Sequence, residues 1–171
     1  MARPREKYWY ALKVFYNRVD RLRDVFKDAS YETFVPMIQT KDGARIVQKP
    51  LIPSLLFVFC PAPFLETLKR EKWDVFMYYK GTDGKGPGAI SDHDMEVFKL
   101  ATSAAAVGAE FLGTETEKYM VGDKVRVTDG PYKGYEGYVR RIKHDRKLLV
   151  CVQGVAVVAF PNVGIENVEK I

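Results

Sequence analysis

The chain has 171 residues, 47% of them hydrophobic, which predicts one or two globular domains. Its 27 basic and 22 acidic residues give a net charge of +5, a mild excess that suits work beside nucleic acid but also an ordinary solvated surface. No stretch reaches the roughly 18 consecutive apolar residues that a membrane-spanning helix needs. Charged residues interrupt the N-terminal segment before a signal peptide could form, so we expect a cytoplasmic protein without membrane partners.

The first 50 residues predict a strand, a helix and a hairpin. Residues 8–16 carry the aromatic and branched side chains typical of a buried strand. Residues 18–30 change period and place apolar side chains on one stripe of a helix, at Val19, Leu22, Val25 and Phe26. In 32–50, the pair Asp42-Gly43 separates two β-like runs and predicts a tight turn.

The next stretch predicts a central strand, a helix, a strand, a glycine-rich loop and a third helix, at 51–59, around 64–73, 75–79, 81–89 and 91–103. Pro53 marks the beginning of the central strand, since proline cannot donate to a ladder. Ser91 and Asp94 resemble a capping box at the beginning of the third helix. The order predicts an α+β domain over 6–103, with one antiparallel sheet and helices on one side.

After a small and polar stretch at 104–118, which we interpret as a linker, residues 119–171 predict a second domain. Five short strands separated by turns favour a small all-β barrel of the SH3-like kind. About fifty residues make a marginal core, but one that can fold alone.

The tail resembles the KOW motif of NusG-type transcription factors and some ribosomal proteins. The pattern fills the framework positions Gly122, Val125, Val127, Gly130, Gly134, Gly137 and Val139. The glycines lie where the chain must turn or bend, and only glycine adopts positive φ without cost. A generic SH3-like barrel without this kinship is the alternative.

The first domain resembles the NGN domain of the NusG family, which comprises transcription elongation and antitermination factors. The resemblance rests on Trp9-Tyr10, 35–38, 50–59 and 89–98, in the right order along almost the whole chain. It implies an NGN domain with ferredoxin-like or RRM-like element order, followed by the KOW barrel. It also implies a monomeric protein that is not an enzyme.

The resemblance implies that an apolar groove of the NGN domain binds the clamp helices of the largest RNA polymerase subunit and disfavours pausing. The matching positions are Trp9, Tyr10, Ile52, Pro53, Leu55 and Phe57. Strand residues alternate between faces, so Leu55 and Phe57 share one face while Leu56 and Val58 share the other. One set must be core; the resemblance favours Leu55 and Phe57 on the outside.

Basic residues are candidates for contacts with non-template DNA, because phosphate binding needs only positive charge. They are Arg18, Arg21 and Arg23 on the first helix and Lys41, Arg45 and Lys49 on the hairpin. A solvated face explains each of them equally well. The basic cluster at 140–147 is interpreted as a solvated hairpin tip.

The tail departs from the family at 153–155. NusG proteins place Phe-Gly-Arg there, where the barrel meets Rho or a ribosomal protein, whereas this chain has Gln153-Gly154-Val155. This puts those partners in doubt and favours a specialised, operon-specific paralogue resembling RfaH or the UpxY-type antiterminators. The alternatives are a housekeeping NusG that couples to Rho and the ribosome, and an RNA-binding module.

The sequence offers no convincing chemical site. Cys60 and Cys151 lie in apolar runs and are interpreted as buried, reduced thiols. Two separated cysteines cannot form a structural zinc site, the 91–94 tetrad is explained by capping, and 84–88 lacks P-loop spacing. With no nucleophile, base and orienting group in one place, we expect no enzymatic activity, no metal and no cofactor.

Overall fold

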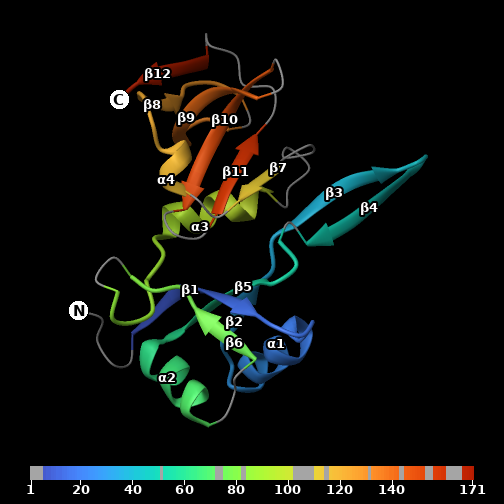
Figure 1. Ribbon diagram of the computed structural model, residues 1–171, viewed down its shortest axis with the longest axis vertical. Coiled ribbons are helices and arrows are strands. Elements are labelled where there is room, and N and C mark those ends of the chain that lie inside the picture. The colour runs from blue at the N-terminus through green and yellow to red at the C-terminus, as the bar shows by residue number, and fades with distance from the viewer. Residues whose placement is uncertain are drawn as a thin grey trace. The chain divides into compact units, whose positions relative to one another are not determined.

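The computed structural model describes residues 6–50, 52–71, 75–81, 84–101, 110–113, 116–130, 132–142, 145–152, 156–160 and 167–171. The contacts between residues divide the chain into two compact units. The first comprises Met1–Pro36 and Ile52–Glu96, and the second comprises Met37–Leu51 and Val97–Ile171. Each unit has its own sheet (Figure 1).

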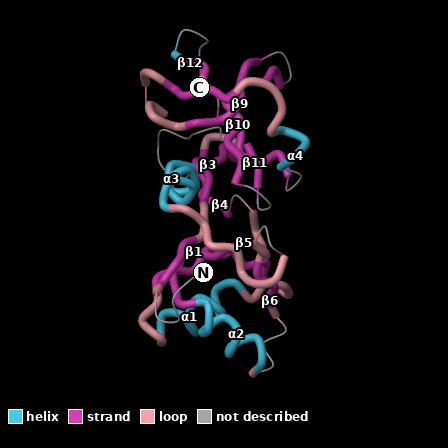
Figure 2. Tube along the Cα trace, turned by 90° about the vertical axis from the view of Figure 1, so that its left-hand side faces the viewer, coloured by secondary structure: helices cyan, strands magenta, loops and turns pink. Residues whose placement is uncertain are grey.

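The first unit is a four-stranded antiparallel sheet in the order β2-β5-β1-β6. Both views show the helices α1 and α2 on the same side of this sheet (Figures 1 and 2). This is the expected α+β arrangement. The elements are β1 (Lys7–Val14), α1 (Val19–Asp28), β2 (Glu32–Phe34), β5 (Leu55–Pro61), α2 (Ala62–Arg70) and β6 (Phe76–Tyr78).

The core of this unit lies between the sheet and the two helices. The stripe predicted for α1 is confirmed, with Leu22 and Phe26 fully buried. Leu65 and Leu68 from α2 complete the helix side. Burying a leucine or phenylalanine side chain contributes about 1.5–3 kcal/mol, so this layer contributes substantially to the unit's stability. The sheet contributes alternate residues, namely Tyr10, Leu12, Val14, Leu56, Val58, Cys60 and Phe76.

The hairpin predicted over 32–50 is divided in two. β2 pairs with β5 in the main sheet, whereas β3 (Met37–Asp42) and β4 (Arg45–Pro50) form a separate two-stranded ribbon. Pro36 lies between them and has no N–H to continue the ladder. The expected turn is present, with Gly43 at φ +64°.

The central strand begins later than the sequence predicts, at Leu55 rather than near residue 51. Residues 52–54 form a turn that is closed by the Leu55 N–H, which donates to the Ile52 carbonyl at 3.1 Å. Pro53 occupies this turn, where its missing N–H costs nothing.

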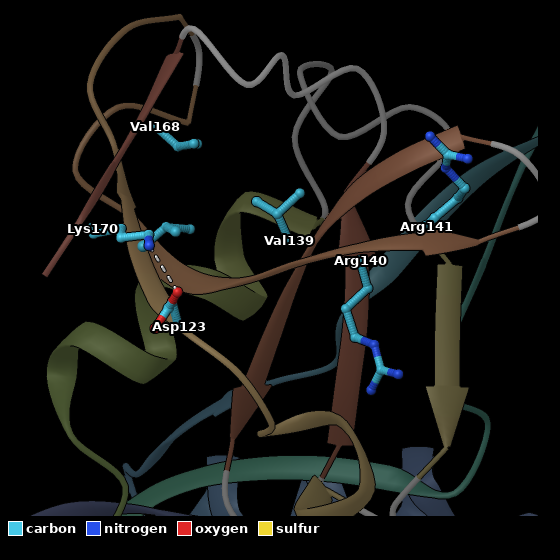
Figure 3. Close-up of a pocket in the computed structure, with 7 residues that line it drawn as sticks. Asp123, Val139, Arg140, Arg141, Val168 and Lys170 are labelled. Carbon is cyan, nitrogen blue, oxygen red and sulfur yellow. Dashed lines mark ion pairs between the residues drawn. The ribbon is translucent and has the colours of Figure 1, made fainter.

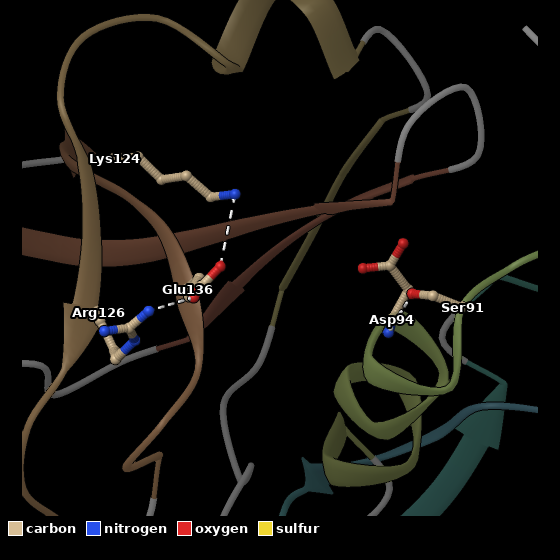
Figure 4. A network of polar contacts seen from close by, with 5 residues as sticks. All are labelled: Ser91, Asp94, Lys124, Arg126 and Glu136. Atoms are coloured by element: carbon tan, nitrogen blue, oxygen red, sulfur yellow. Dashed lines mark hydrogen bonds and ion pairs between the residues drawn. The ribbon is translucent and has the colours of Figure 1, made fainter. Parts of the chain in front are cut away.

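Helix α3 (Asp92–Ala101) begins at the predicted cap. The Asp94 N–H donates to the Ser91 hydroxyl oxygen at 3.1 Å (Figure 4). Just before the cap, the Ile90 N–H donates to the Trp9 carbonyl at 2.8 Å. This bond ties the beginning of α3 to the central strand β1.

The second unit contains a six-stranded antiparallel sheet in the order β12-β8-β9-β10-β11-β7. The five strands expected for the barrel are present. Within the stretch interpreted as a linker, 104–118, strand β7 pairs with β11, so this stretch adds to the sheet. The elements are β7 (Glu110–Gly113), α4 (Thr116–Tyr119), β8 (Lys124–Val127), β9 (Glu136–Ile142), β10 (Asp145–Val152), β11 (Ala156–Phe160) and β12 (Val168–Lys170).

Strands β10 and β11 are buried on both faces. One face carries Leu148, Val150, Val158 and Phe160, and the Phe160 ring lies 5.1 Å from that of Tyr132. On the opposite face, Leu112 from β7 and Tyr119 from α4 pack against a small cluster of Leu149, Val157 and Ala159. Leu112 of the expected linker and Tyr119 directly after it therefore cover this face of the barrel.

The glycines of the β8–β9 connection have two different functions. Gly130 and Gly134 adopt φ +89° and +92°, as the turn requires. Gly137 was expected to act in the same way, but its φ is not positive. It is needed because a Cβ there would lie 2.3 Å from the Leu149 carbonyl oxygen.

Each unit holds one thiol. Cys60 is fully buried in the first unit, and burial raises its pKa to about 12. Cys151 is half-buried in the second unit, and burial raises its pKa to about 11. Both are free. Cys60 is the buried, apolar side chain that the sequence predicts, whereas Cys151 is less enclosed than expected.

A small network of charges joins the strands at one edge of the barrel. Glu136 on β9 accepts a hydrogen bond from Arg126 at 2.9 Å and lies 3.5 Å from Lys124, both on β8 (Figure 4). Arg126 also lies 3.7 Å from Glu169 on β12. The Arg126 hydrogen bond is the main reason why the pKa of Glu136 lies below its ordinary value of 4.5.

Replacing Gly137 with alanine will destabilise the barrel by about 1–3 kcal/mol, because the added methyl group meets a backbone oxygen that the β9–β10 ladder holds in place. Urea unfolding followed by circular dichroism measures the loss. Gly86→Ala is the matched control, since no atom lies within 4 Å of its Cβ position. Equal stability of the two variants would contradict this explanation of Gly137.

Replacing Glu136 with glutamine will lower the stability by a few tenths to about 1 kcal/mol at neutral pH, because the pair is only partly shielded from solvent. A carboxyl group whose pKa is lowered in the folded state stabilises the fold at pH values above its ordinary pKa. This stabilisation is lost as the pH falls and the group is protonated. The difference between variant and wild type will therefore shrink below pH 4.5. The control is Asp20→Asn, which removes an exposed ion pair with Arg23 at 3.8 Å. Its stability will differ little from that of the wild type both at neutral pH and at low pH.

Candidate interaction surfaces

The sheet of the first unit has a second apolar face, directed away from α1 and α2. The register pairs Trp9 with Phe59, Ala11 with Phe57, and Lys13 with both Leu55 and Met77. An antiparallel sheet with helices on one side ordinarily carries polar residues on the other. Here that face is mostly apolar, with Lys7, Lys13 and Glu32 at its ends, and we call it the apolar face. Its apolar side chains are Trp9, Ala11, Phe34, Leu55, Phe57, Phe59 and Met77.

Aromatic rings connect the strands across the apolar face. The Trp9 ring lies 5.3 Å from that of Phe59, and the Phe34 ring lies 6.4 Å from that of Phe57. Such pairs add about 0.5–1.5 kcal/mol beyond the area that they bury. The apolar face is thus a second packed layer built on the central strands.

The centre of the apolar face is closed, and its margin is open. Leu55, Phe57 and Trp9 are exposed by only 1%, 0% and 5%. In the part of the chain that the structure describes, Leu55 and Phe57 lie on the side opposite the helix core, yet they are not an exposed surface. The accessible apolar residues are Phe34, Phe59 and Met77 on the apolar face and Ile52 and Pro53 in the turn that leads into β5. We call these five residues the margin.

Tyr10 lies on the other side of β1. It packs among the helix-side core residues, is 2% exposed, and has its pKa raised mainly by burial. The structure therefore separates Tyr10 from Trp9, Leu55 and Phe57, although the resemblance to the family groups all four.

Met77 is a residue of this surface that the sequence analysis missed. It is 52% exposed on the edge strand β6, between two residues that pack against the core. The alternation within 75–79 carried this signal, because Phe76 and Tyr78 share one face and Met77 has the other. The sequence predicts this run only as a strand.

The three arginines of the first helix do not form one basic surface. Arg18, Arg21 and Arg23 are all exposed. Arg21 and Arg23 are two residues apart, so they point in different directions from the helix. Arg23 also lies 3.8 Å from Asp20, which offsets its charge.

The basic residues of the ribbon are better placed. Arg45 and Lys49 are exposed on the same face of β4, with Val47 between them. Ile46, on the other face of β4, is 68% exposed. The side chain of Lys41 lies outside the described residues.

The KOW positions form the framework of the barrel. Val125 and Val127 are buried, Val139 is half-buried, and Gly122 adopts φ +96°. Their burial and backbone geometry suit a structural role. Gln153-Gly154-Val155 lies outside the described residues.

No metal or membrane feature emerges from the described part of the chain. Its His, Cys, Asp and Glu residues do not gather in groups of three or more that could hold a metal ion. None of its helices is long and apolar enough to span a bilayer.

Comparisons with known proteins agree with this architecture. The family described as NusG, "Transcription termination factor nusG", matches residues 7–99, and the KOW motif matches residues 121–152. No curated protein matches the chain. A solved structure titled "Domain interaction in Thermotoga maritima NusG" is similar in fold, with a TM-score of 0.52, 16% sequence identity and coverage of 97% of this chain and 98% of that one.

The match over 7–99 takes in more than half of the 171 residues and all of β1 to β6. The KOW match takes in the glycine turn and the strands that follow it. The chain therefore belongs to the NusG family of transcription elongation and termination factors, which are not enzymes.

Proposed function

We propose that this protein binds the clamp helices of the largest RNA polymerase subunit through the margin of its apolar face, and thereby suppresses pausing or termination. The supporting observation is that a sheet already covered by helices on one side is apolar on the other as well. An exposed apolar surface is a common docking site for a helical segment. The NusG family binds RNA polymerase generally, which makes this the first partner to test.

The contact itself involves the accessible margin. Ile52 and Pro53 lie in the turn before β5, and Met77 lies on β6, the edge strand next to β1. Trp9, Leu55 and Phe57 support this margin from within and set its shape. Tyr10 acts from the opposite side by fixing β1 to the helix core.

We further propose that the protein acts on selected operons. The sequence has Gln153-Gly154-Val155 where the family places an aromatic residue and an arginine. Without these anchors, binding of Rho or of a ribosomal protein at this position loses its aromatic and bidentate contacts. A housekeeping NusG coupled to Rho and the ribosome is the alternative.

A contact with non-template DNA is proposed for the basic residues, foremost Arg45 and Lys49 on the ribbon. These two exposed cations share a face of β4 and can contact two separate phosphates of one DNA strand. Lys41, Arg18, Arg21 and Arg23 remain secondary candidates.

The double variant Ile52→Asp, Met77→Asp tests the polymerase contact. We expect binding to core RNA polymerase in a pull-down or titration to weaken by about tenfold or more, because two apolar contacts are replaced by charges that must be desolvated. The suppression of pausing in transcription assays should fall in parallel. Circular dichroism checks the fold.

The matched control is Met120→Asp, Val121→Asp, which introduces the same charges at two exposed apolar residues of the second unit. Equal polymerase binding by the two folded double variants would refute the assignment of the margin. Stimulation of Rho-dependent termination by the wild type would favour the housekeeping alternative. Tight, sequence-specific RNA binding without polymerase would favour the RNA-binding module.

The double variant Arg45→Ala, Lys49→Ala tests the DNA contact. Each phosphate contact with a single strand contributes about 0.7 to the slope of log affinity against log salt concentration, so the slope should fall by about 1.4. Fluorescence anisotropy with labelled single-stranded DNA measures it. Gln48→Ala, on the opposite face of β4, should leave the slope as it is; an unchanged slope in the double variant would exclude these cations.

A further inference from the structure

The second unit has a hollow of about 460 Å³ where β8, β9 and β12 meet. Its floor consists of Val125, Val139 and Val168, one from each strand. Figure 3 shows Lys170 and Asp123 at one end, Val139 between, and Arg141 towards the other end. The hollow belongs neither to the apolar face nor to the ribbon.

The register explains why the hollow is open and apolar. Val125 pairs with Gly137, which has no side chain, and Val139 follows on the same face of β9. Gly137 cannot be larger because the Leu149 carbonyl lies behind it. Val168 pairs with Val127 from the edge strand β12. The interior face of the barrel thus reaches the surface at this point.

The charges around the hollow are unequal at its two ends. Lys170 and Asp123 lie 3.0 Å apart and neutralise each other. Arg140 is directed to α4, where it donates to the Lys118 carbonyl at 3.2 Å. Arg141 is exposed, and among the described residues it has no ion-pair partner. The hollow therefore combines an apolar floor with positive charge at one end.

We propose that this hollow docks a short acidic segment of a partner protein, which places an apolar side chain on the valine floor and a carboxylate beside Arg141. Charge complementarity at the arginine end selects an acidic partner, and the branched floor selects an aliphatic anchor. This site gives the barrel a partner of defined chemistry. It does not depend on the polymerase contact proposed above.

The lining favours a peptide over the other ligands of similar charge. Single-stranded nucleic acid is ordinarily held by bases stacked on aromatic side chains, and the described residues that line the hollow include none. Small molecules bind in clefts that enclose most of their surface. Here Asp123, Arg141 and Lys170 are exposed at the rim, which suits an extended segment lying across the hollow.

The test uses the full chain and a fluorescein-labelled peptide in which two leucines are flanked by glutamates. Fluorescence anisotropy should show saturable binding that weakens as salt screens the arginine. Arg141→Glu should weaken binding by about tenfold, because it replaces an attraction by a repulsion. Lys133→Glu, an exposed residue of the β8–β9 turn with the same change of charge, should bind like the wild type.

Two further probes test the floor and the class of ligand. Exchanging the two leucines for serines should abolish saturable binding, since the valines then have no apolar group to cover. Equal affinity of the Arg141→Glu and Lys133→Glu proteins would overturn the proposal, as would preference for a labelled single-stranded DNA over the acidic peptide. The double variant Ile52→Asp, Met77→Asp should still bind the peptide. A failure of the polymerase proposal can therefore be distinguished from a failure of the peptide proposal.

Discussion

The antiparallel pairing of β1 with β5 is the interaction on which the first unit depends. The two strands run side by side from Lys7 opposite Pro61 to Lys13 opposite Leu55. This register places one set of alternating side chains against α1 and α2 and the other set on the apolar face. A shift of the β1–β5 register by one residue would exchange the two sets of side chains. This register therefore determines which side chains form each layer. Because both layers are packed, the sheet has little freedom to shift.

The second unit uses the same principle on β10 and β11, but it completes the second layer differently. There the outer face is covered by Leu112 and Tyr119, which come from just before the barrel in sequence. The first unit instead leaves Met77 and Pro53 accessible at the margin of its second layer. The first unit thus offers an accessible apolar margin for a partner, whereas the barrel offers a smaller hollow.

Short sequence patterns predicted the helices, turns and caps well, but they did not predict which face of the central strand packs against the helices. The helix stripe around Leu22, the Gly43 turn and the Ser91 cap each follow from short-range physics, and each is confirmed. The apolar run at 55–60 has side chains of one kind on both faces, so no pattern within it can tell which face the helices cover. The burial of Phe57 therefore could not be derived from the sequence. The separation of Tyr10 from Trp9 could be derived, because neighbouring residues of a strand point to opposite faces. Gly137 illustrates a related limit, since glycine is required there by the Leu149 carbonyl oxygen on another strand, which the local sequence does not reveal.

The buried thiol of Cys60 offers a way to observe the opening of the first unit. A cysteine that is enclosed and held in its protonated form reacts with alkylating reagents only when its surroundings open. Cys60 sits in the core of the first unit and Cys151 on the inner strand β10 of the second. The rate at which Cys60 is modified thus records how often the first unit opens, whereas Cys151 is only half-buried and is already partly accessible. The chain therefore carries a native chemical probe of its first unit, without any engineered label.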